Sequence, residues 1–244
     1  MPSSLPHQTS ALVDPATGRA LPAAVLWDMD GTLIDTEPYW IAAEMALVAE
    51  SGDTWTHEDA LSLVGSDLLV AAGVLQERGG VRLGSAEIVE RLVGSVSDAM
   101  ARAMPWRPGA REVLERLRVA GVPCALVTMS YQVLAARLVA AVPEGTFAAV
   151  VTGDQVSRGK PDPEPYRVAA ERLGVDASSC VAFEDSPPGL ASAAAAGARV
   201  VGVQSVVPLP QSPGLSRVPT LEPVDLTMIA AVAAGDVLDL LAED

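Results

Sequence analysis

The chain has 244 residues, half of them apolar, which is enough for one large domain or for one domain that carries an insert. Acidic residues outnumber basic ones by 31 to 16, and the formal charge of -15 disfavours binding to nucleic acid or anionic lipid. No stretch has the pattern of a signal peptide or the length of a membrane helix, so we expect a cytoplasmic protein with no nucleic-acid or membrane partner.

The N-terminal segment, residues 1–22, is rich in Pro, Ser and Thr and predicts a mobile extension. The sequence AAVLWD follows and is typical of a buried strand that ends at Asp28. Directly after it, DMDGTLIDTE contains four carboxylates, at Asp28, Asp30, Asp35 and Glu37. Like charges beside a buried strand repel one another, so either a cation and an anionic substrate organise them or they are solvated loop residues.

Residues 37–104 change to a helical pattern. Apolar residues recur three and four positions apart, with Gly-rich breaks, in PYWIAAEMALVAE, HEDALSLV, DLLVAAGVLQERGG and SAEIVERLVGSVSDAMARAM. This pattern predicts an all-helical block inserted after the first strand.

After PWRPG, short apolar runs alternate with amphipathic stretches. The expected strands are PCALVT, FAAVVTG, SCVAFED and ARVVGV, and the expected helices are AREVLERLRVAG, YQVLAARLVAAV, PEPYRVAAERLG and PGLASAAAAG. The alternation predicts an α/β fold with a parallel sheet covered on both faces. The first strand joins this sheet, so the predicted core is 23–36 with 105–244, and the predicted cap is 37–104. Within that core, residues 205–222 are expected to be a Pro-rich loop and residues 225–244 a terminal helical segment.

The two cysteines, Cys124 and Cys180, lie in or beside expected strands. Free cysteine is among the most buried residue types, and a reduced compartment disfavours disulfides. We therefore expect two buried thiols.

Polar residues that could react follow the expected strands. They are Asp28 and Asp30 after the first strand, Thr128 and Ser130 after PCALV, Lys160 in the loop after AAVVTG, and Glu184 and Asp185 after SCVAF. Because the carboxyl ends of parallel strands share one edge, these segments should meet in one crevice. A carboxylate nucleophile, a second carboxylate for proton transfer, hydroxyl donors, an ammonium and an acidic pair for Mg²⁺ together suit phosphoryl transfer.

Lysine usage bears on the same site. Lys160 is the only lysine in the chain, and the other fifteen of the 16 Lys and Arg residues are Arg. An ammonium differs from a guanidinium in size, planarity and hydration, so either this position needs Lys or a biased genome left one lysine behind.

The stretches DMDGTLID, LVTMS, GKPDPEPY and FEDSPPGLASAAAAG resemble the four ordered motifs of the haloacid dehalogenase superfamily. The resemblance covers residues 23–204 and is to the branch with a small helical cap, which includes beta-phosphoglucomutase-like proteins and sugar-phosphate phosphatases. It implies a Rossmann-like core, and a Mg²⁺-dependent phosphatase that hydrolyses a small phosphate monoester through an aspartyl-phosphate. EPYW favours a sugar phosphate, and we expect a monomer or a weak homo-oligomer.

The resemblance also implies roles for the core residues. Asp28 would attack phosphorus, and Asp30 would protonate the leaving oxygen and later activate water. Thr128 would hydrogen-bond a phosphoryl oxygen beside Met129 and Ser130, and Lys160 would balance charge. The Mg²⁺ ligands would be the Asp28 carboxylate, the Asp30 carbonyl and Asp185, with Glu184 as a second acidic contributor.

Further positions follow from the same resemblance. Gly31 would allow a tight turn, and Thr32 would brace the loop. Glu37, Tyr39, Trp40 and residues 64–67 are candidate substrate contacts in the cap, although aromatic side chains on amphipathic helices are more often core. His57 fits a solvated helix start better than a catalytic site.

Other functions remain open from the sequence. A phosphomutase shares the core chemistry, but its cap would hold a second phosphate with Arg, and LVGSDLLVAAG contains no Arg. Dehalogenases of the superfamily lack an acid equivalent to Asp30. A receiver-like phospho-aspartate switch would carry its Asp after a middle strand in a chain about half as long. Met129 and Pro188 depart from the branch's usual residues and bear on substrate shape.

Overall fold

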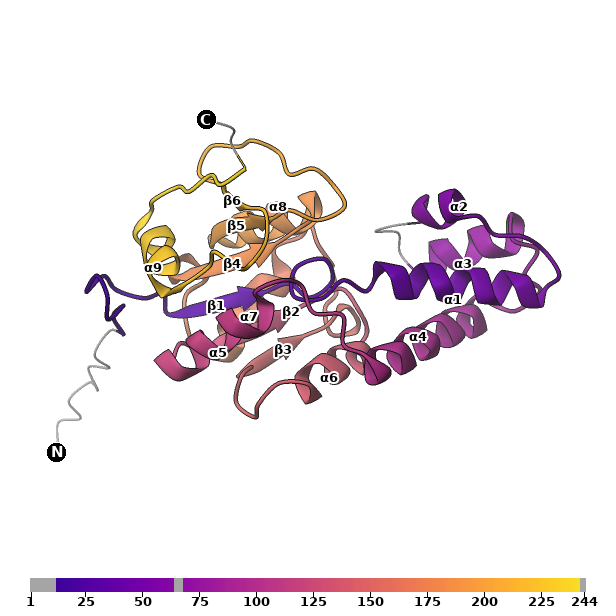
Figure 1. Cartoon of the computed structure of the whole chain (residues 1–244), viewed down its shortest axis with the longest axis horizontal. Helices are drawn as coiled ribbons and strands as arrows, with labels where there is room; N and C mark the ends of the chain where they lie inside the picture. The colour runs from indigo at the N-terminus through magenta and orange to yellow at the C-terminus, as the bar shows by residue number, and fades with distance from the viewer. Residues whose placement is uncertain (1–11, 64–67, 242–244) are drawn as a thin grey trace.

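The computed structural model describes residues 12–63 and 68–241. Six strands form one parallel sheet in the order β3-β2-β1-β4-β5-β6 (Figure 1). They are β1 (Ala24–Trp27), β2 (Cys124–Val127), β3 (Ala149–Val151), β4 (Cys180–Glu184), β5 (Arg199–Val203) and β6 (Ser216–Val218). Every residue of β1, β2 and β4 is buried, as is typical of parallel strands covered on both faces. Because β1 lies between β2 and β4, their carboxyl ends are neighbours.

Helices cover both faces of the sheet. Trp27 and Phe183 belong to one buried cluster, and their rings stack at 4.3 Å. Leu26 and Ala182 belong to a second cluster, on the opposite face. The first face is covered by α5 (Ala110–Ala120), α6 (Gln132–Ala140) and α9 (Leu226–Ala234), and the second by α7 (Glu164–Leu173) and α8 (Pro187–Ala196). Two short 3-10 helices, Gly153–Gln155 and Ala177–Ser179, complete the connections. The predicted α/β fold is confirmed.

Four helices form a lobe to one side of the sheet (Figure 1). They are α1 (Glu37–Glu50), α2 (His57–Leu61), α3 (Leu68–Glu77) and α4 (Ser85–Arg102). Leu47, Leu75 and Leu92, on three of these helices, are all buried in the larger cluster. At the start of α2, Thr56 and Asp59 form a reciprocal capping box, which fixes where that helix begins. The helical insert is therefore present where the apolar periodicity predicted it.

The two cysteines are buried and free, as predicted. Cys124 on β2 and Cys180 on β4 pair with neighbouring residues of β1, so their side chains point to opposite faces of the sheet. With β1 between them they are roughly two strand spacings, about 10 Å, apart, which is too far for a disulfide. Burial raises the pKa of Cys124 to about 12 and that of Cys180 to about 11, so both remain thiols.

Residues 12–22 differ from the expected mobile extension. Val13 pairs with Ala20 across a tight turn, and the buried Asp14 accepts a hydrogen bond from Thr227 in α9 at 3.1 Å. Arg19 forms an ion pair with Asp236. This part of the segment therefore packs against α9, while residues 1–11 lie outside the described residues.

The C-terminal region differs from the expected loop and helix in two places. The Pro-rich stretch contains the edge strand β6, and α9 ends at Gly235, whose φ of +104° stops the helix. The chain then runs extended, and Asp239 pairs with Arg217 of β6. No helix in the described ranges is both long and apolar enough to cross a membrane.

Candidate active site

The reactive residues expected from the sequence meet at the carboxyl ends of β1, β2 and β4. Lys160 lies at the centre of this group. Its Nζ donates hydrogen bonds to Asp28 Oδ1 at 2.6 Å, to Glu184 Oε1 at 2.5 Å and to the carbonyl oxygen of Val127 at 2.9 Å. The Lys160 side chain is only 6% exposed. Burial lowers the pKa of this ammonium, but the Asp28 and Glu184 carboxylates raise it by more, so Lys160 stays protonated.

Glu184 accepts a hydrogen bond from Lys160, and both of its carboxylate oxygens have hydrogen-bond donors within the protein. Its Oε1 also accepts a hydrogen bond from the Tyr166 hydroxyl at 2.7 Å, and its Oε2 accepts from the Ser186 hydroxyl at 3.1 Å. Gly189 in α8 leaves room for this carboxylate, because a Cβ there would overlap it. Glu184 is therefore a buried acceptor whose oxygens all face protein donors.

Asp30 lies on the more open side of the same loop. Its Oδ1 accepts from the Thr36 hydroxyl at 2.6 Å, and its Oδ2 accepts from Ser130 Oγ at 2.7 Å and Thr128 Oγ1 at 3.2 Å. Thr128 Oγ1 in turn accepts the Ser130 backbone N–H at 2.9 Å. The two aspartates of DMD thus face different partners, Asp28 the buried lysine and Asp30 a set of hydroxyl groups.

Three carboxylates lie close enough together to bind a cation. Asp28, Glu184 and Asp185 each offer an oxygen, and these oxygens lie within 4.8 Å of one another. Asp28 Oδ2 is buried and has no hydrogen-bond partner among the described residues. Burial and the neighbouring Glu184 raise the pKa of Asp28 well above its usual range and that of Asp185 to about 7. One ammonium does not balance this charge, and an all-oxygen donor set suits a hard divalent cation such as Mg²⁺. Since every oxygen of Glu184 faces a protein donor, Asp28 and Asp185 fit that cation best.

The two small residues after Asp30 are both tightly confined. Gly31 has φ +85°, and a Cβ at this position would overlap the Asp185 carboxylate, so the predicted tight turn requires glycine. Thr32 is fully buried, and its hydroxyl oxygen has no hydrogen-bond partner among the described residues. Thr32 therefore contacts the loop by packing, and that it braces the loop stays a prediction.

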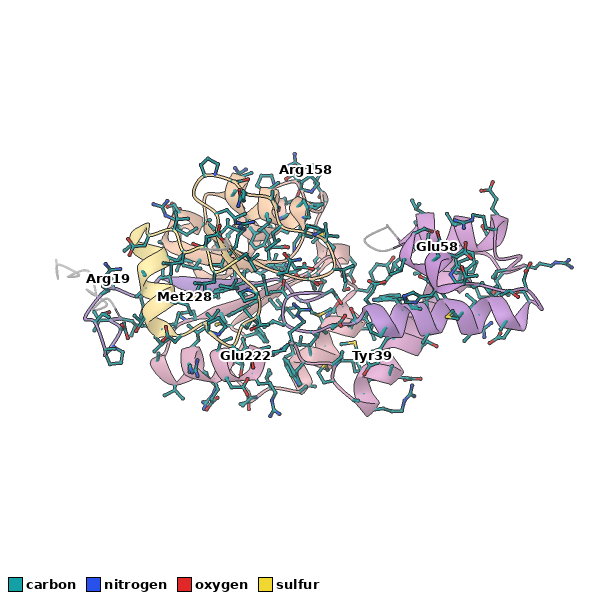
Figure 2. All side chains as sticks on the ribbon, turned by 45° about the horizontal axis from the view of Figure 1, so that its top comes forward. Arg19, Tyr39, Glu58, Arg158, Glu222 and Met228 are labelled. Atoms are coloured by element: carbon teal, nitrogen blue, oxygen red, sulfur yellow. The ribbon has the colours of Figure 1, made fainter. Side chains whose placement is uncertain are left out.

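The cap candidates differ in what they contact. The Tyr39 hydroxyl donates to the Ala103 carbonyl at 2.8 Å, which joins the first turn of α1 to the end of α4 where the lobe meets the sheet (Figure 2). Trp40 is half-buried and packs against the larger apolar cluster. Glu37 is half-buried, and burial together with Asp35 and Asp30 raises its pKa. His57 is exposed at the start of α2, and residues 64–67 lie outside the described residues.

Two residues contact the site in ways that the sequence did not indicate. Tyr166, in the first turns of α7, donates to Glu184 and places its ring 5.3 Å from Lys160 Nζ. Met129 directs its sulfur toward the backbone of Lys160, and its place beside the phosphate stays a prediction. Tyr166 belongs to GKPDPEPY, and its spacing of six residues from Lys160 was the available signal.

A parallel α/β core with a helical insert and an acidic, lysine-containing crevice at the strand ends defines a recognisable class of enzyme. Residues 22–197 match the family model described as haloacid dehalogenase-like hydrolase. The chain therefore belongs to this family and is a hydrolase.

Named relatives agree with this membership. The chain is 34% identical over 182 residues to a phosphorylated carbohydrates phosphatase of Thermotoga maritima, covering 74% of this chain and 84% of that protein. It is 30% identical over 221 residues to hexitol phosphatase B of Escherichia coli, covering 88% and 96%. The crystal structure of CbbY from Rhodobacter sphaeroides in complex with phosphate superposes with a TM-score of 0.74 at 26% identity, covering 83% of this chain and 96% of that one.

Proposed function

We propose that this chain is a Mg²⁺-dependent phosphatase that hydrolyses a small phosphate monoester, with a sugar phosphate favoured, through an aspartyl-phosphate. The observation that carries the proposal is the placement of Asp28, which has one oxygen held by Lys160 and the other without a hydrogen-bond partner among the described residues. A buried carboxylate oxygen fixed in this way is suited to act as a nucleophile. The relatives named as phosphatases of phosphorylated carbohydrates and hexitols support the reaction and the substrate class.

The Asp28 and Asp185 carboxylates would hold Mg²⁺. The family resemblance adds the Asp30 backbone carbonyl as a third ligand. When bound, Mg²⁺ would offset the charge of the carboxylates and of the incoming phosphate, so that both can share one crevice.

The chain's own residues supply the remaining chemistry. Asp28 Oδ2 attacks phosphorus, and the bond from phosphorus to the ester oxygen breaks while Asp30 gives its proton to the leaving alcohol. Asp30 then takes a proton from water, which attacks the same phosphorus atom and frees Asp28 and inorganic phosphate. The Thr128 and Ser130 hydroxyls donate to Asp30 in this structure, and on substrate binding they would turn to donate to phosphoryl oxygens instead. Lys160 offsets negative charge in both steps.

Phosphate release from a panel of sugar phosphates, phosphoglycolate and nucleotides, measured with the purified chain and Mg²⁺, tests the proposal. We expect turnover that EDTA abolishes, and a loss of at least about a thousandfold in kcat for Asp28→Asn with an unchanged melting temperature. Asp35→Asn, in the same acidic stretch, serves as the matched control and should retain most activity.

A folded chain that releases no phosphate, or an active Asp28→Asn variant, would refute the assignment. Phosphomutase activity would release no net phosphate and would be detected as isomerised sugar phosphate by chromatography of the same reactions. Location in the cytoplasm and oligomeric state stay predictions.

A further inference from the structure

Met129 lies in the loop after β2, between the two hydroxyl residues Thr128 and Ser130, and is half-buried. Its Sδ atom is 3.4 Å from the backbone nitrogen of Lys160 and accepts that N–H. Thioether sulfur is a weak acceptor, but it is polarizable and its flexible side chain adapts to an irregular gap. Among the described residues, Met129 Sδ is the partner of the Lys160 amide.

A second contact fixes the same loop from the neighbouring position. A Cβ on Gly159 would lie 2.9 Å from Met129 Sδ, so the sulfur packs directly against the backbone just before Lys160. The backbone of Met129 also lies against Gly153, where a Cβ would overlap the Met129 carbonyl group. Met129 thus contacts both ends of the segment 153–160, which leads from β3 toward α7.

The position of the Lys160 backbone matters because its ammonium has little freedom. Nζ reaches Asp28, Glu184 and the Val127 carbonyl at 2.5 to 2.9 Å, and the side chain is almost completely buried. A shift of the loop away from Met129 would lengthen these contacts together. A displacement of about 1 Å in a group that positions reacting atoms is enough to lower a rate by two orders of magnitude.

We propose that Met129 is a positioning residue, whose sulfur holds the backbone at Gly159 and Lys160 so that the only lysine of the chain reaches Asp28 and Glu184. The effect on turnover rests on the proposed function, in which Lys160 balances charge during phosphoryl transfer. The contact itself can be tested without turnover.

The single lysine makes that test direct. Labelling the full chain with [¹⁵N]lysine gives one backbone amide signal, that of Lys160, in a ¹H–¹⁵N correlation spectrum. Met129→Leu keeps the volume and removes the acceptor, and we expect it to shift this signal. Met45→Leu, an exposed methionine in α1, is the matched control and should leave the signal in place. An unmoved signal in Met129→Leu would overturn the proposal.

A double-mutant cycle tests the consequence for catalysis. Gly159→Ala pushes the sulfur away, and we expect kcat to fall about tenfold with KM changed less than twofold, since the effect is on the transition state. Removing the sulfur with Met129→Ala relieves that clash, so Met129→Ala with Gly159→Ala should be at least threefold more active than the product of the single effects.

Gly153→Ala is the control for the cycle, because it meets the Met129 carbonyl and not its side chain. The effects of Gly153→Ala and Met129→Ala on kcat should be additive. If Gly153→Ala is inactive, additivity is measured on the melting temperature instead. Additive behaviour of the Gly159 pair would contradict the proposal. If the wild-type chain releases no phosphate, the proposed function fails, and the Lys160 amide signal still decides whether Met129 holds this backbone.

Discussion

The core and the cap each bury a carboxylate, but they balance its charge differently. In the core, Asp28 and Glu184 share the ammonium of Lys160. In the cap, Glu44 of α1 is buried and accepts one hydrogen bond, from Trp55 Nε1 at 3.2 Å. Among the described residues Glu44 has no ion-pair partner, and burial raises its pKa to about 7. Burial raises the pKa of the carboxyl groups in both regions, but in the core the Lys160 ammonium lowers the pKa of Asp28 against that effect, and in the cap no cation does so for Glu44 among the described residues.

The difference follows from what each region needs. A buried carboxylate must be paired with a cation or take up a proton, because an isolated charge is strongly disfavoured away from water. A protonated cap carboxyl is adequate for packing under Trp55. A nucleophile has to be available as a carboxylate, and Lys160 favours that form of Asp28 by opposing the effects of burial and of Glu184 on its pKa. The comparison predicts which substitutions are costly and how their cost depends on pH.

Replacing the shared cation should produce the largest effect. Lys160→Met leaves Asp28 and Glu184 buried without a counter-charge, and we expect a loss of about 3–5 kcal/mol in unfolding free energy at pH 8 together with loss of turnover. Urea unfolding in EDTA measures the stability without a contribution from metal. Arg118→Met, which breaks an exposed ion pair with Glu115 in α5, is the matched control and should change stability little. A Lys160→Met variant as stable as the control would mean that the core does not depend on this cation.

Replacing the buried cap glutamate, Glu44, by a neutral residue should raise the unfolding free energy instead of lowering it. The folded pKa of Glu44 is about 7 and its ordinary value is 4.5, so the folded state binds the extra proton between these pH values. The contribution of Glu44 to stability is therefore complete below pH 4.5 and is lost as pH rises toward 7. Glu44→Gln keeps an acceptor for Trp55, and we expect it to stabilise the chain by about 2 kcal/mol at pH 8 and by little at pH 4.5.

Thermal or urea unfolding of Glu44→Gln and wild type across pH 4.5 to 8 measures this difference. Glu90→Gln, an exposed glutamate in the middle of α4, is the matched control and should follow the wild-type pH dependence. If Glu44→Gln destabilises the chain at pH 8, then Glu44 is ionised and held by a cation or substrate group, and the contrast with the core disappears.

The sequence was sufficient for five of the six strands and for most of the crevice. Apolar runs of strand length alternate with amphipathic stretches, and parallel strands bring Asp28, Thr128 and Glu184 to one edge wherever such a sheet forms. These positions depend on local pattern and on a general property of the fold, so they can be predicted without knowing any side-chain contact.

The parts that the sequence did not predict depend on contacts between distant residues. Asp14 and Thr227 are 213 residues apart, and their hydrogen bond folds a segment whose composition is typical of a mobile tail. Tyr166 lies on the buried face of α7, and periodicity does not distinguish a tyrosine that only packs from one that donates to a buried carboxylate. The contact of the Met129 sulfur with the Lys160 amide could not be predicted from the sequence either, because thioethers have no preferred partner.

Removing the Tyr166 hydroxyl should have the smallest effect on stability, and it tests whether Lys160 is the only important hydrogen-bond donor to Glu184. Tyr166→Phe removes one neutral donor from Glu184 Oε1 and leaves Lys160 and Ser186 in place, so we expect a loss of about 1 kcal/mol in unfolding free energy and less than a tenfold fall in kcat. Tyr39→Phe removes a hydroxyl that bonds the Ala103 carbonyl at the exposed junction with the cap, and it should cost less because water can replace that donor. If Tyr166→Phe were as unstable as Lys160→Met, the phenol would stabilise the buried Glu184 carboxylate as much as the ammonium does. A hydrogen-bond network around Glu184, more than a single cation, would then organise the core.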